Sequence, residues 1–129
     1  MTVSADTSPR STRRHVPAVS RIVLGGIGIA AFAGAFASIG ILAPLLWLAP
    51  DLTMLAGLSR DMPRDGRMAR RAVPFYNAAH ALFGPLALSA AGLVAGPLAF
   101  GLGLVWLSHV LVDRAVGYGL RTPEGFQRG

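Results

Sequence analysis

The chain has 129 residues, of which 53% are hydrophobic, and its mean hydropathy is +0.53. It contains no cysteine, which excludes disulfide bonds, thiolate metal sites and cysteine nucleophiles. The net charge of +6 comes from arginines that lie in a few short segments, so it indicates membrane topology and not nucleic-acid binding.

Residues 1–20 are rich in Ser, Thr, Pro and Arg, a composition that predicts a disordered cytoplasmic tail. An alternative is a cleaved export signal, because Arg13 and Arg14 precede an apolar run that contains Ala35-Phe36-Ala37. The apolar run continues well beyond Ala37, however. We therefore favour an uncleaved first membrane helix.

Two long apolar stretches follow this segment. The first, Ile22–Leu58, has Asp51 as its single charged residue, and the second, Ala72–Val112, has no Asp, Glu, Lys or Arg. As single helices they would be ~55 and ~60 Å long, whereas the hydrocarbon core is ~30 Å thick. Each stretch should therefore cross the membrane twice. The sequence predicts an all-α membrane protein, a four-helix transmembrane bundle built from two helical hairpins.

The predicted transmembrane domain occupies residues 21–120, with helices at about 21–37, 41–58, 74–90 and 97–116, before a short cytoplasmic tail at 121–129. Pro50 lies inside the second helix and should kink it. The first helix is dense in small residues. Ala30, Gly34 and Ser38, at four-residue spacing, would allow close helix contacts, including contacts between copies in a homo-oligomer.

The arginines precede the first helix, separate the two apolar stretches and lie at the C-terminal end, whereas the turns near 38–40 and 91–97 are uncharged. The positive-inside rule then places both termini in the cytoplasm of a bacterial inner membrane. The expected surroundings are the lipid bilayer, without nucleic acid. The arginines are Arg10, Arg13, Arg14, Arg21, Arg60, Arg64, Arg67, Arg70, Arg71, Arg114, Arg121 and Arg128.

Polar residues on three predicted helices share one depth in the cytoplasmic leaflet. Counted from the helix ends, Asp51 lies ~10 Å deep, Asn77 and His80 ~8 and ~12 Å, and His109 and Asp113 ~12 and ~6 Å. Residues three or four apart share a helix face, so Asn77 joins His80 and His109 joins Asp113. Polar groups in membrane helices normally face the bundle interior. The sequence therefore predicts one polar site.

Two histidines and two aspartates are suitable ligands for zinc or another divalent metal. Without metal, an Asp–His pair could act in acid–base catalysis. Axial haem ligation by the two histidines is less favoured, because the acids would sit poorly around a porphyrin. The predicted ligands or proton carriers are Asp51, His80, His109 and Asp113, while Asn77 and Arg114 would orient groups or stabilise charge.

A second interpretation needs no catalysis. His109 and Asp113 could bond across one helical turn, Asp51 could pair with Arg114, and Asn77 could link helices. The protein would then be a non-catalytic membrane subunit or a transport element whose polar layer is structural or relays ions. The first interpretation, chemistry on a lipid-like substrate, is the one we favour.

Three short motifs carry a family resemblance: PDL-ML at Pro50–Leu55, YN-AH at Tyr76–His80, and H---DR--GYGL at His109–Leu120. Together they resemble the domain of unknown function 4260 family of small bacterial integral membrane proteins, over about 21–126. The resemblance implies a four-helix membrane protein and supplies no catalytic assignments. Its motifs include Asp51, Asn77, His80, His109, Asp113 and Arg114.

Overall fold

The computed structural model describes residues 17–57, 63 and 65–128. Most of the predicted tail at 1–20, with Arg13 and Arg14, therefore lies outside the described residues. The elements are α1 (Ala18–Ile39), α2 (Leu42–Leu46), the 3₁₀ helix η1 (Ala49–Gly57), α3 (Val73–Ala79), α4 (Phe83–Ala95) and α5 (Pro97–Val116). The described part of the chain has no strand, only an isolated bridge between Arg121 and Gln127, so the all-α class is confirmed.

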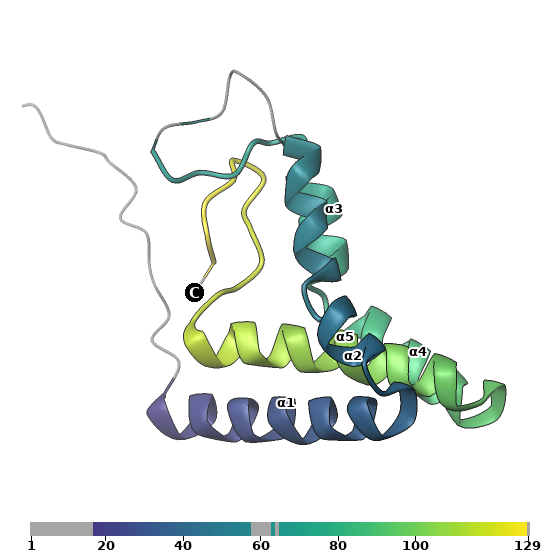
Figure 1. Ribbon diagram of the computed structural model, residues 1–129. Helices are drawn as coiled ribbons and strands as arrows, with labels where there is room; N and C mark the ends of the chain where they lie inside the picture. The colour runs from purple at the N-terminus through teal and green to yellow at the C-terminus, as the bar shows by residue number, and fades with distance from the viewer. Residues whose placement is uncertain (1–16, 58–62, 64, 129) are drawn as a thin grey trace, which may run out of the picture.

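Helix α5 is the central element. Helix α1 runs antiparallel along one side of it and α4 packs against it from another, whereas η1 and α3 stand across this layer (Figure 1). Small residues allow the close contacts. A methyl group on Gly28 would lie 3.1 Å from Val112 Cγ2, and one on Gly34 would lie 3.0 Å from Leu104 Cδ1. These glycines of α1 thus pack inside the chain, against α5.

Three helices are long and apolar enough to cross a membrane: Ala18–Ile39, the combined α3–α4 segment Val73–Ala95, and Pro97–Val116. Large apolar side chains cover their outer faces. Phe83 is 82% exposed and Val94 is 92% exposed. Such apolar surface is rare on water-soluble monomers but suits contact with lipid tails. The fold is therefore that expected of an integral membrane protein.

The second predicted helix, 41–58, differs from expectation. In a continuous α-helix the Pro50 ring would clash with the carbonyl of Leu46, and α2 ends at that residue. The chain resumes as the 3₁₀ helix η1, in which Asp51 N donates to Leu48 O at 3.1 Å. Because Leu42–Gly57 is short and broken, the structure does not support it as a fourth crossing helix. The arrangement as two transmembrane hairpins is not confirmed.

The third predicted helix, 74–90, is present but bent. Helix α3 ends at Ala79 and α4 begins at Phe83. A continuous helix would drive the Pro85 ring into the carbonyl of Ala81, which accounts for the break. The bend leaves His80 as the residue that ends α3 and turns the chain into α4.

The segment after α5 is folded as far as Arg128. Gln127 Nε2 donates to Gly117 O at 2.7 Å, and Arg128 N donates to Leu120 O at 2.8 Å. Gly125 O accepts from Met68 N at 3.0 Å, which ties the tail to the loop before α3. Residues 121–128 of the predicted tail are therefore part of the packed structure.

Candidate metal centre

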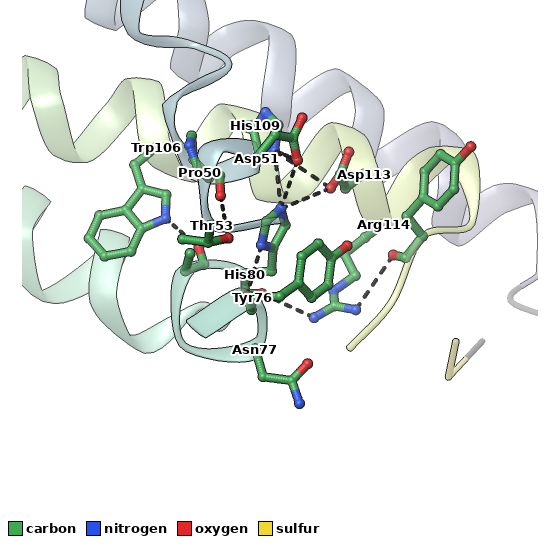
Figure 2. A network of polar contacts seen from close by, with 12 residues as sticks. Pro50, Asp51, Thr53, Tyr76, Asn77, His80, Trp106, His109, Asp113 and Arg114 are labelled. Atoms are coloured by element: carbon green, nitrogen blue, oxygen red, sulfur yellow. Dashed lines mark hydrogen bonds and ion pairs between the residues drawn. The ribbon is translucent and has the colours of Figure 1, made fainter. Parts of the chain in front are cut away.

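Three elements bring four of the predicted site residues together. Asp51 comes from η1, His80 from the bend after α3, and His109 and Asp113 from consecutive turns of α5 (Figure 2). One ligand atom from each residue lies within 4.8 Å of the other three. The cluster thus exists although the second predicted helix does not form as expected.

The spacing of these atoms is the main property of the cluster. Asp51 Oδ1 lies 3.2 Å from His80 Nε2 and 3.4 Å from His109 Nε2. Asp113 Oδ2 lies 3.5 and 3.6 Å from the same two nitrogens, which are 3.3 Å apart. Zinc bonds of about 2.0–2.2 Å in a tetrahedron place ligand atoms about 3.3–3.6 Å apart. Five of the six ligand pairs therefore have nearly tetrahedral separations.

Burial divides the cluster into a closed side and an open side. His80 and His109 are only 2% and 1% exposed. The side chain of Asp113 is 20% exposed and that of Asp51 is 40% exposed. A molecule that approaches the cluster would therefore meet the carboxylate of Asp51 first.

The protein fixes one nitrogen of His80 as a donor. His80 Nδ1 lies 2.9 Å from the Tyr76 carbonyl oxygen, which can only accept. In the neutral ring the proton is then on Nδ1, and Nε2 presents a lone pair to the cluster. That lone pair faces two carboxylate oxygens and a second imidazole nitrogen. Such an arrangement needs a positive charge between these atoms, either a metal ion or protons.

Aromatic rings hold both imidazoles in place. The Tyr76 ring stacks on His80 with centroids 3.9 Å apart and planes 16° apart. The edge of Trp47 meets His109 with centroids 5.0 Å apart, and Trp47 Nε1 donates to Ser108 Oγ at 3.2 Å. Sequence reasoning missed Trp47. Its position four residues before the predicted acid of the same helix was the available signal.

Arg114 is not part of the cluster but contacts the backbone of His80. Its Nη2 donates to the carbonyl oxygen of His80 at 3.2 Å, while Trp106 Nε1 donates to the carbonyl oxygen of Ala79. In an unbroken helix these two carbonyls would accept hydrogen bonds from the backbone N–H groups of residues 83 and 84. Side chains of α5 therefore satisfy the carbonyls that the bend leaves open, and they fix the position of His80.

Asn77 points away from the imidazoles (Figure 2). Its Nδ2 donates to Arg121 O at 2.9 Å, and its Oδ1 accepts from Arg121 N at 2.7 Å. This pair of hydrogen bonds joins α3 to the C-terminal segment. Of the six predicted site residues, four form the cluster, Arg114 supports the backbone of His80, and Asn77 binds elsewhere.

The geometry is poorly suited to haem. The two Nε2 atoms, 3.3 Å apart, leave no room for a porphyrin plane between His80 and His109. The carboxylates of Asp51 and Asp113 also lie where the ring would extend. A small cation fits this donor set better.

The family model described as domain of unknown function (DUF4260) matches residues 18–129. No curated protein and no solved structure matches the chain. The family match covers α1 to the end of the C-terminal segment and includes all four residues of the cluster. The chain therefore belongs to the DUF4260 family.

Proposed function

We propose that Asp51, His80, His109 and Asp113 bind one divalent metal ion, with zinc the favoured metal. The near-tetrahedral spacing of the four ligand atoms carries this proposal. Charge balance supports it, because two carboxylates and two neutral imidazoles would neutralise a divalent cation. A metal ion and ligands with no net charge cost less free energy to bury in a membrane protein than a charged group does.

The surroundings of the cluster favour an apolar, lipid-like substrate. A cavity of about 350 Å³ beside the cluster is lined by Pro50, Thr53 and Trp106 together with leucines of α2, α4 and α5. A second cavity, of about 300 Å³, is lined by Trp47 and Ser108, next to the other imidazole. Both volumes are within the range of small-molecule sites, about 300–1,000 Å³. The cluster residues themselves line neither cavity, but Pro50 and Ser108, which directly precede Asp51 and His109 in the chain, do, so an apolar chain in either cavity would lie next to the cluster.

The chemistry we propose is metal-assisted or acid–base. A bound divalent ion would polarise a carbonyl or phosphoryl oxygen and make a bound water more acidic. The chain itself fixes the tautomer of His80 through Tyr76 O and keeps water from the imidazoles with two aromatic rings. Asp51, as the most exposed ligand, is the group best placed to exchange a proton with a substrate.

We further propose that the protein lies in a bacterial inner membrane with both termini in the cytoplasm. Arg21 Nε donates to Ala115 O at 2.6 Å, which joins the start of α1 to the end of α5. The arginine-bearing ends of these helices therefore lie at the same end of the molecule. The positive-inside rule assigns that end to the cytoplasm.

A second candidate function is favoured by the same contacts. Protonated imidazoles of His80 and His109 could donate to Asp51 and Asp113 at the observed 3.2–3.6 Å separations. The cluster would then be a structural or ion-relaying layer in a non-catalytic subunit or transport element. Association of several copies would accompany this function, through small residues of α1 that do not pack on α5, such as Gly26 and Ala30.

The experiment that tests the first function is elemental analysis of the full chain purified in mild detergent, with an absorption spectrum. We expect about one divalent metal per chain, as a single tetrahedral site predicts. His80→Ala and His109→Ala should lose the metal and still insert into membranes, whereas the matched control Asn77→Ala should retain it. A wild-type chain that binds no added zinc would favour the second candidate. A Soret band would instead show haem.

A further inference from the structure

A second polar site lies between the start of α3 and the C-terminal segment. It is a cavity of about 340 Å³ with three arginines in its wall, Arg70, Arg121 and Arg128. None of the four cluster residues lines it. Arginines from two distant parts of the sequence thus line one cavity, outside the candidate metal centre.

The central arginine is held by the fold. The backbone N and O of Arg121 are bound by the Asn77 side chain at 2.7 and 2.9 Å. Its guanidinium carbon lies 5.6 Å from the centre of the Tyr76 ring. Arg121 Nε is buried and has no hydrogen-bond acceptor among the described residues. The fold thus holds this guanidinium beside a cavity whose described lining residues include no carboxylate, an arrangement that suits the binding of an anion.

Carboxylates near the cavity do not balance the arginines. Glu124 is exposed, and its pKa is lowered first by the hydrogen bond with the Thr122 side chain and, to a lesser extent, by Arg70 and Arg128. That carboxylate is therefore ionised at neutral pH. The described residues that line the cavity include three arginines and no carboxylate, so the cavity is electropositive even with Glu124 nearby.

The position of the cavity suggests the anion. Helix α5 has 20 residues, so it spans ~30 Å, the thickness of the hydrocarbon core. The segment that follows Val116 therefore lies at the level of lipid headgroups. Guanidinium groups bind phosphate oxygens in a bidentate manner. We propose that Arg70, Arg121 and Arg128 form a binding site for a phosphate group, supplied either by an anionic lipid headgroup or by soluble phosphate.

Calorimetric titration of the full chain in neutral detergent micelles would test this site. The probes are inorganic phosphate, dihexanoyl phosphatidic acid and, as a control, dihexanoyl phosphatidylcholine. We expect saturable binding of a phosphate probe that Arg70→Gln and Arg121→Gln each weaken about tenfold or more, as the loss of a charge-assisted hydrogen bond predicts. Arg21→Gln is the matched control, because it removes the same charge at the same end of the molecule but does not line the cavity.

The outcomes separate the two sources of phosphate. Equal affinity for both phosphate probes would assign the site to soluble phosphate, whereas much tighter binding of phosphatidic acid would assign it to a lipid headgroup. The proposal is overturned if phosphatidylcholine binds equally well, or if the Arg21 variant weakens binding as much as the cavity variants do.

Arg128→Gln changes an exposed side chain and gives the same readout if the Arg121 variant fails to fold. Glu124→Gln should strengthen binding. Because no metal ligand lines the cavity, this result is independent of metal content.

Discussion

The Nε2 atoms of His80 and His109 lie 3.3 Å apart, and both rings are almost completely buried. Two lone pairs at this distance repel each other unless a cation or a proton lies close by. The contact arises because α3 ends at Ala79 and the chain turns toward α5 at His80. The predictions below test the cluster, the bend that forms it, and the contacts around it.

Cobalt should report the coordination geometry. Co²⁺ accepts the same nitrogen and oxygen ligands as Zn²⁺ and, when four-coordinate, absorbs visible light strongly. We expect intense visible bands after cobalt is added to the metal-free chain, and their loss in His109→Ala. Weak bands typical of six-coordinate cobalt would contradict the near-tetrahedral site.

Removal of the proline that bends the third helix should weaken metal binding. Pro85→Ala would let the helix continue through His80 and turn its imidazole away from Asp51. We expect about a tenfold or greater loss of zinc affinity, together with higher helix content by circular dichroism. Pro97→Ala is the control, because Pro97 lies in the first turn of α5, where proline causes no bend. Equal affinity in both variants would show that the bend does not depend on Pro85.

Asn77→Ala should loosen the C-terminal segment and leave the metal centre intact. The variant loses two hydrogen bonds to the Arg121 backbone, so unfolding should require about 1–3 kcal/mol less free energy. Its metal content should stay at the wild-type value. Limited proteolysis should cut the segment after Val116 faster in the variant. Loss of metal with no change in proteolysis would instead place Asn77 in the site.

The packing of α4 on α5 should depend on Gly92. A methyl group at this position would collide with the backbone of Phe100, so Gly92→Ala should lower stability by at least about 1–3 kcal/mol, the usual cost of overpacking. Gly26→Ala is the matched control, since a methyl group there would have no atom within 4 Å. Thermal melting in detergent measures both variants. Equal melting temperatures would mean that the two helices do not pack as described.

Several features follow from the sequence alone. The predicted helix at 97–116 has the same bounds as α5, because proline starts it and glycine ends it. The proximity of Asp51, His80, His109 and Asp113 was also predictable from their expected depths. Depth depends only on residue counts along apolar segments, and burying a polar group in a membrane is costly unless it meets a partner.

Other features were decided by tertiary structure. The segment 41–58 was predicted as one continuous membrane helix, yet Leu42–Gly57 is divided between α2 and η1 and is shorter than the three helices that are long enough to cross a membrane. Asn77 was predicted to join the polar layer, yet its amide binds the backbone of Arg121, 44 residues away. The sequence determined which polar residues come together in one cluster. The directions of their side chains depended on the bends before Asp51 and after His80, and on hydrogen bonds between residues that only the folded chain brings together.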